Sequence, residues 1–144
     1  DFINQLMNST TVAQMQEVLL SMISSICPTP EKSLSSNGLI TDIMEYIELN
    51  YTDVNLSPTL VGEHFQLTSS YLSNIFKDKT NYSIFYYIHY VRITHAKKLL
   101  AETNKKIEEI ISMVGYTNRA TFSRFFKKFE GITAGKYREI HSNR

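Results

Sequence analysis

The chain has 144 residues, of which 42% are hydrophobic and 20% charged, and its formal net charge is +1. This composition is typical of a globular protein and excludes a largely disordered chain. The single cysteine, Cys27, excludes an intramolecular disulfide framework and suits a reducing compartment. No apolar run approaches the roughly 18–20 residues of a membrane span, and we expect no signal peptide. The first residue is Asp rather than Met, so we expect the chain to be part of a longer protein.

Basic residues gather near the C-terminal end of the chain. Residues 117–144 hold seven Lys or Arg against two Glu, whereas residues 1–37 hold one Lys against three acidic residues. A basic end on a near-neutral chain is typical of a surface that binds the phosphates of a nucleic acid. An ordinary solvated helix gives the same charge pattern, so charge alone leaves both interpretations open.

The spacing of apolar residues predicts an all-α fold. Apolar positions 12, 15, 19, 22 and 26 predict an amphipathic helix over residues 11–27, and the Pro- and Ser-rich residues 28–38 predict a linker. Helices are then predicted over residues 39–51, 57–65, 69–79, 83–101, 107–114, 119–129 and 134–141. Most of them follow a residue that can cap a helix N-terminus, namely Ser57, Thr68, Ser83, Asn104, Asn118 and Thr133. The alternating pattern of β-strands is missing.

An internal repeat relates two segments of the chain. Residues 71–77 (YLSNIFK) match residues 121–127 (TFSRFFK) at an offset of 50, and positions upstream match at an offset of 49. Each copy is predicted to be a short helix, a tight turn and a second helix, which is a helix-turn-helix unit. The repeat therefore predicts two such units, over about residues 57–80 and 106–130, joined by a long linker helix over 83–101.

The second helix of each unit carries a polar face that suits DNA. This face holds Ser70, Ser73, Asn74 and Lys77 in the first unit and Arg119, Thr121, Ser123, Arg124 and Lys127 in the second. Arg can bind guanine through two hydrogen bonds, Asn can do so with adenine, and Ser or Thr can serve either base. Free backbone N–H groups at the helix starts, after Thr68 and Asn118, can bind phosphates. The residues favour double-stranded DNA binding over the alternative, a helical bundle whose polar faces simply meet water.

From about Leu39 to Arg138 the sequence resembles the AraC/XylS family of bacterial transcription regulators. The matching motifs are Tyr71-Leu72-Ser73-x-x-Phe76-Lys77, Arg92-x-x-x-Ala96-x-x-Leu99-Leu100, Ile107-x-x-Ile110, Val114-Gly115-Tyr116-x-Asn118, Phe122-Ser123-Arg124-x-Phe126-Lys127-Lys128, Gly131-Ile132-Thr133 and Tyr137-Arg138. The resemblance implies that residues 38–144 form a DNA-binding domain whose two recognition helices enter successive major-groove segments on one side of the duplex. Family positions that touch bases fall on Ser70, Ser73, Asn74, Arg119, Ala120, Thr121 and Arg124. Lys77 and Lys127 are assigned to phosphate contacts or to structure, and Arg92 to an internal tether.

The sequence departs from the family pattern at several positions. Gln66 and Asn81 stand where the family has glycines, and Asn adopts left-handed backbone angles more easily than Gln. Gly62 and Ile111 replace the usual Ala, and Ala134 replaces a common Pro. These departures leave the local turn geometry open, and we expect them not to change the fold. Because the first polar face has no Arg, we also expect the second unit to dominate the preference for a DNA sequence.

The patterns that would indicate catalysis or a metal site are missing. The four His residues lack metal-ligand spacing, and motifs of phosphate-binding loops, zinc proteases and serine hydrolases are absent. We therefore expect neither enzyme activity nor a cofactor. The tyrosines at positions 82, 86, 87 and 90 could stack on bases, but we expect them to pack between the linker helix and its two units.

Residues 1–37 are interpreted as the tail of a missing upstream sensor region. Their helix follows heptad spacing for only two heptads, so packing on another domain is favoured over a homodimer through this segment.

The expected partners are double-stranded DNA, the upstream sensor domain and, in the intact regulator, RNA polymerase. We expect a cytoplasmic protein, although the intact chain could be anchored in a membrane upstream of residue 1. The competing function is a protein-interaction module or dimerisation fragment that uses the helical fold without reading bases.

Overall fold

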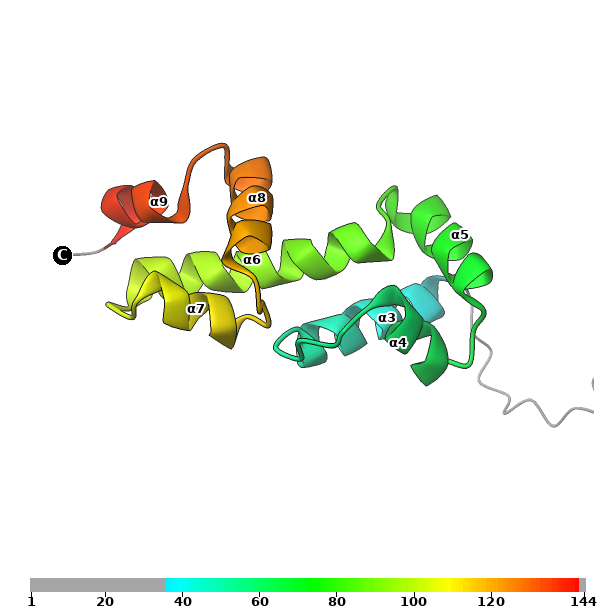
Figure 1. The fold of residues 1–144 in the computed structure, drawn as a ribbon. Coiled ribbons are helices and arrows are strands. Elements are labelled where there is room, and N and C mark those ends of the chain that lie inside the picture. The colour runs from blue at the N-terminus through cyan, green and yellow to red at the C-terminus, as the bar shows by residue number, and fades with distance from the viewer. Residues whose placement is uncertain (1–35, 143–144) are drawn as a thin grey trace, which may run out of the picture. The chain divides into compact units, whose positions relative to one another are not determined.

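The computed structural model describes residues 36–142, which contain seven helices and no strand (Figure 1). The helices are α3 (Ser36–Asn50), α4 (Pro58–His64), α5 (Ser69–Thr80), α6 (Ile84–Glu102), α7 (Ile107–Met113), α8 (Arg119–Glu130) and α9 (Ala134–His141). The predicted all-α fold is confirmed. Helix α3 begins inside the predicted linker of residues 28–38, because buried Leu39 and Ile40 tie its first turns to the core. The helix predicted over residues 11–27 lies outside the described residues.

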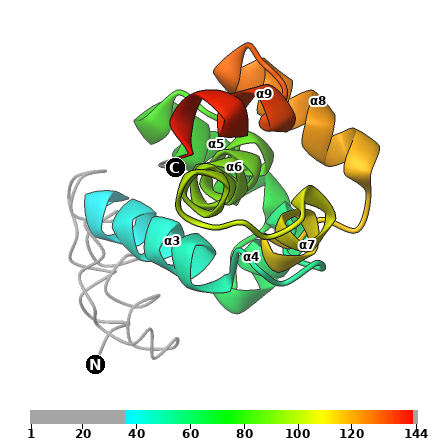
Figure 2. The same cartoon turned by 90° about the vertical axis from the view of Figure 1, so that its left-hand side faces the viewer.

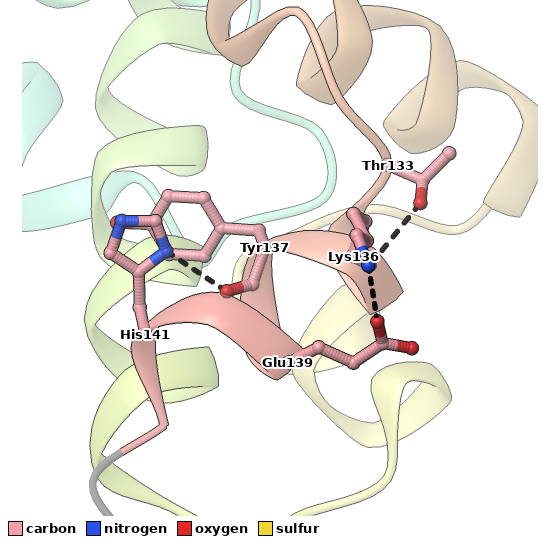
Figure 3. A network of polar contacts seen from close by, with 5 residues as sticks. All are labelled: Thr133, Lys136, Tyr137, Glu139 and His141. Atoms are coloured by element: carbon pink, nitrogen blue, oxygen red, sulfur yellow. Dashed lines mark hydrogen bonds and ion pairs between the residues drawn. The ribbon is translucent and has the colours of Figure 1, made fainter.

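Local hydrogen bonds fix where most of the helices begin. The predicted caps Ser57, Thr68, Ser83, Asn118 and Thr133 each accept, through the side chain, a hydrogen bond from a backbone N–H two or three residues on. Figure 3 shows the cap of α9, with the Thr133 hydroxyl facing the N–H of Lys136. Each cap of this kind stabilises a helix by about 1 kcal/mol. Helix α7 differs from the prediction, because Lys106 rather than Asn104 precedes it and donates its N–H to the Glu109 carboxylate at 2.8 Å.

Two hydrophobic cores lie along α6, one for each helix-turn-helix unit. From here on, the first unit includes α3 and the loop after it, and the second unit includes α9. The first, formed with α3, α4 and α5, contains Phe76, and the second, formed with α7, α8 and α9, contains Phe126. The neighbouring α6 residues Val91 and Ile93 belong to different cores, while the ring of Tyr51 packs against both. Figure 2 views α6 nearly end-on, with the other helices around it. Helix α6 is therefore the predicted linker helix, and it takes part in both cores.

The turns of the two units share one backbone conformation despite their different residues. Gln66 has a φ of 56° where the second unit has Gly115 at 81°. After the recognition helices, Asn81 has a φ of 61° and Gly131 a φ of 74°. The structure settles the turn geometry that the sequence left open, because Gln66 and Asn81 both adopt the left-handed angles that glycine adopts most easily.

Candidate DNA-binding surface

The recognition helices α5 and α8 each have a buried apolar face and, on the opposite side, an exposed polar face. Under α5 lie Leu72 and Phe76, and under α8 lie Phe122 and Phe126, all at most 1% exposed. The outward faces hold the predicted residues Ser70, Ser73, Asn74, Lys77, Arg119, Ala120, Thr121, Ser123, Arg124 and Lys127, all exposed except the half-buried Thr121. Helix α8 stands over the middle of α6, and α5 lies beyond the residues where α6 begins (Figure 1). The structure thus gathers the predicted residues on two separate helix faces.

Helix α8 carries most of the positive charge of these faces. Its Arg124 guanidinium carbon lies 5.3 Å from the centroid of the Phe125 ring, which holds the cation over the edge of the buried face. Lys127 is exposed and makes no ion pair with any described residue. Both cations are therefore available to an anionic partner. Lys128 instead lies over a ring of the linker helix, with its Nζ atom 5.2 Å from the centroid of Tyr86.

Arg119 has a partner that sequence reasoning missed. Its guanidinium forms an ion pair with the carboxylate of Glu108 in the first turn of α7, and both side chains are largely exposed. The two residues are 11 positions apart in different helices, so no helical periodicity pairs them. Their contact depends on how the turn between α7 and α8 folds back. Glu108 is thus an acidic residue at the edge of the α8 face.

The face of α5 is polar and less charged. Asn74 and Lys77 line an open hollow of about 660 Å³ together with Tyr71, Asp78 and two further residues. Asp78 lines the same hollow as Lys77, and its negative charge reduces the attraction for phosphate. Tyr71, which sequence reasoning did not assign to the surface, is 51% exposed and adds a phenol hydroxyl.

The N-termini of both recognition helices are already capped. The hydroxyl of Thr68 accepts from the N–H of Tyr71 at 3.3 Å, and the Asn118 side chain accepts from the N–H groups of Ala120 and Thr121 at 2.7 and 3.2 Å. The prediction that these helix starts offer free N–H groups to phosphates is therefore wrong for the three groups that the caps bind. Fewer backbone donors remain for a phosphate at either helix start.

The structure confirms the prediction that Arg92 is an internal tether and not a DNA contact. Its side chain is buried in α6, where Nε donates to the Tyr51 carbonyl at 2.9 Å and Nη2 to the Asp53 carbonyl at 2.6 Å. Burial lowers the pKa of the Arg92 guanidinium, and the two carbonyl oxygens supply the hydrogen bonds that a buried cation requires. The guanidinium is therefore part of the interior and not of the DNA-binding surface.

The tyrosines at positions 86, 87 and 90 pack between the linker helix and the two units, as predicted, although Tyr90 is 49% exposed. The rings of Tyr86 and Tyr90 lie 4.8 and 5.9 Å from the ring of Phe129 in α8, and Tyr87 lies 5.5 Å from Phe76 in α5. Tyr82 differs from the prediction, because it precedes α6, is 52% exposed and stacks on Tyr86 with ring centroids 5.2 Å apart. These rings connect the linker helix to both units.

Comparison with known proteins identifies the family. A family model described as a helix-turn-helix domain matches residues 61–140, more than half of the chain. The C-terminal domain of the two-component response regulator yesN from Fusobacterium nucleatum is 35% identical, with a TM-score of 0.64 over 67% of this chain and 93% of that one. The chain belongs to the AraC-type helix-turn-helix family. The two units joined by α6 are therefore those of an AraC-type DNA-binding domain.

Other relatives of this AraC-type chain are transcription regulators. The HTH-type transcriptional regulator YtdP of Bacillus subtilis is 34% identical over 100 residues, which are 69% of this chain and 13% of that protein. The Msm operon regulatory protein of Streptococcus mutans is 29% identical over 135 residues, 92% of this chain and 48% of that protein. The chain thus spans less than half of the length of these relatives. The members of this family are DNA-binding transcription regulators and in general not enzymes.

Two further features of residues 36–142 bear on the site. Within this range no helix is long and apolar enough to cross a membrane. The same residues contain no group of three or more His, Cys, Asp or Glu that could hold a metal ion.

Proposed function

We propose that this AraC-type domain binds a specific double-stranded DNA sequence through both helix-turn-helix units and so regulates transcription. Helices α5 and α8 would enter adjacent major-groove segments on the same side of the duplex. The proposal rests chiefly on the exposed face of α8, where Arg119, Arg124 and Lys127 project from a helix whose opposite face is buried. A major groove about 12 Å wide admits one α-helix, and cations on its outer face meet base edges and phosphates.

The two helices would contribute different contacts. Arg124 has no acidic partner among the described residues and suits two hydrogen bonds to one guanine, whereas Asn74 suits adenine. Lys77 and Lys127 suit phosphates, which orient the protein without reading sequence. Smaller side chains would complete the contacts to bases, namely Ser70, Ser73, Ala120, Thr121 and Ser123.

The second unit is proposed to dominate sequence preference. Its recognition helix holds two Arg on the outward face, while the face of α5 holds none and has Asp78 beside its single predicted cation. Hydrogen bonds from a charged guanidinium are roughly twice as strong as neutral ones. The first unit would then add affinity and a second, weaker base preference.

Residues 1–37 are proposed to belong to the part of the regulator that lies outside the DNA-binding domain. They would connect an upstream sensor region to the DNA-binding domain of residues 38–144. The intact regulator would act on RNA polymerase in the cytoplasm. Packing of the predicted helix over 11–27 on another domain is preferred to a homodimer through it. Sedimentation of the 144-residue chain tests the second possibility, because a homodimer requires a mass that rises with concentration.

The direct test is selection of bound duplexes from a random DNA pool at moderate salt. A bipartite site with halves about one helical turn apart would support reading by both units. Enrichment of one short half-site would mean that α8 reads DNA alone. No enrichment, together with binding that disappears at physiological salt, would contradict sequence-specific recognition by this chain.

A salt titration separates DNA binding from the competing function, a protein-interaction module or dimerisation fragment. Binding through phosphates releases counterions, so the logarithm of the affinity must fall linearly with the logarithm of the salt concentration. Lys127→Ala should reduce that slope, since it removes one cation from the face of α8. A slope near zero for the wild-type chain would favour the interaction module.

A further inference from the structure

A buried junction connects the two helix-turn-helix units across α6. Arg92 binds the carbonyl oxygens of Tyr51 and Asp53, which lie in the loop between α3 and α4 of the first unit. The same guanidinium lies over the ring of Tyr116, in the turn between α7 and α8 of the second unit, with its carbon 5.3 Å from the ring centroid. One side chain of the linker helix therefore contacts both units at once.

At this junction the backbones of the two units lie against each other. A Cβ atom added at Gly115 would lie 2.5 Å from the carbonyl oxygen of Tyr51, 3.0 Å from that of Thr52 and 3.1 Å from Nε of Arg92. Backbone atoms cannot give way as the end of a flexible side chain can. Any side chain at position 115 would therefore push the α7–α8 turn away from the first unit.

The junction extends to the recognition helix α8. The Tyr116 hydroxyl is hydrogen-bonded to Nδ1 of His89 at 2.7 Å, and the His89 ring stacks on Phe125 of α8 with centroids 3.7 Å apart and 11° between the planes. All three side chains are at most 6% exposed. A displacement of Tyr116 would thus change the packing under the helix that carries Arg124.

We propose that Arg92, Gly115 and Tyr116 form an inter-unit clamp that fixes α8 relative to α5 and makes the domain selective for the spacing between its two half-sites. This inference rests on the proposed reading of DNA by both units. The two units have separate cores, so without the clamp the shared helix α6, its tyrosine contacts and the Tyr51 ring that packs on both cores would set their orientation. One inserted base pair moves a half-site by about 3.4 Å and turns it by about 34°. Rigidly held units cannot follow that change, whereas loosely joined units can.

The test compares three proteins on duplexes that carry the selected bipartite site, the same site with its spacer changed by one base pair, or the second half-site alone. The wild type should lose about tenfold in affinity per base pair of change, as for loss of a base-specific contact. Arg92→Met should reduce that penalty about fivefold while binding the single half-site like the wild type. Lys97→Met is the matched control, because Lys97 pairs from α6 with Glu130 of α8 inside the second unit, and it should keep the wild-type penalty.

A second variant and a second measurement keep the proposal testable if Arg92→Met fails to fold. Arg92→Met leaves two carbonyls without a donor, so Tyr116→Phe, which removes only a hydroxyl, is examined as well.

Spin labels at Asp78→Cys and Ser112→Cys in a Cys27→Ser background report the distance between the units without DNA. The distribution should be narrow in the wild type and broader in both variants. Unchanged spacing penalties and unchanged distributions would overturn the clamp. Failure of the wild type to select a bipartite site would overturn two-unit reading instead, while the distance distributions still decide the clamp.

Discussion

Gln66 holds, in the turn of the first unit, the left-handed backbone that Gly115 holds in the second, with φ values of 56° and 81°. A residue with a Cβ atom pays about 1–2 kcal/mol in this region, because the Cβ atom crowds the carbonyl oxygen. Gln66 keeps this conformation because the turn must lead the chain from α4 into the recognition helix α5. A hydrogen bond from the Leu67 N–H to the Gly62 carbonyl, 2.8 Å long, stabilises the turn.

Replacement of Gln66 by Gly should therefore stabilise the domain. We expect the free energy of unfolding to rise by about 0.5–1 kcal/mol, since relief of strain exceeds the extra entropy of glycine in the unfolded chain. Urea denaturation measures the change. Gln66→Ala is the control, because it keeps the Cβ atom and removes only an exposed amide. Equal stability of the Gly and Ala variants would contradict backbone strain at this turn.

Arg124 should carry one base preference. Arg124→Ala is expected to weaken binding to the selected duplex by about 1–3 kcal/mol and to relax preference at a single base position. Fluorescence anisotropy on the selected duplex and its single-base variants measures both effects. Lys127→Ala, a phosphate contact in the proposal, should weaken binding to all duplexes alike. If Asn74→Ala cost more specific affinity than Arg124→Ala, the second unit would not dominate sequence preference.

The local part of this structure could be predicted from the sequence. Helices and their caps depend on residues two to four positions apart, so apolar spacing and residues such as Ser57 and Thr68 indicate them directly. The internal repeat also aligns Gln66 with Gly115, and the left-handed backbone of both residues agrees with that alignment. The outward direction of Arg124 and Asn74 follows from the same periodicity, because their helix neighbours Phe125 and Ile75 turn inward.

Contacts between the units could not be predicted in this way. Arg92 bonds to residues 41 and 39 positions earlier, and His89 to one 27 positions later. These partners meet only because both units pack on α6, and no periodic pattern in one sequence encodes that packing. The family resemblance indicated that Arg92 is a tether but not what it binds. The pair of Glu108 with Arg119 lies within the second unit, and it was missed because it depends on how the turn between α7 and α8 folds.

Glu108 should limit the affinity of the α8 face for DNA. Glu108→Gln removes the acidic partner of Arg119, and the pair is exposed enough that its loss should scarcely change stability. Affinity for DNA should rise by up to about fivefold, because one arginine is released and one charge that repels phosphate is removed. Binding assays at two salt concentrations measure this, with Glu109→Gln as a control on the same turn. A fall in specific affinity would show instead that Glu108 orients Arg119 for base contact.

His89 should make the stability of the domain depend on pH. Burial, followed by the positive charges of Arg92 and Arg124, lowers the pKa of its imidazole from 6.5 to about 4. Between these values the unfolded chain binds a proton that the folded domain excludes, so the free energy of unfolding falls as the pH is lowered. The stabilisation is complete above about pH 6.5 and lost as the pH falls through about 4.

Urea denaturation at pH 7 and pH 5 tests this linkage. The wild type should lose about 2 kcal/mol more than His89→Gln over this interval, because Gln does not titrate and can still bond to the Tyr116 hydroxyl. His141→Gln is the control, since this imidazole is exposed at the end of α9, where it stacks on Tyr137 (Figure 3). It should keep the wild-type pH dependence. Equal losses in the wild type and His89→Gln would mean that the buried imidazole is protonated in the folded domain, and that the junction around Tyr116 tolerates a second cation beside Arg92.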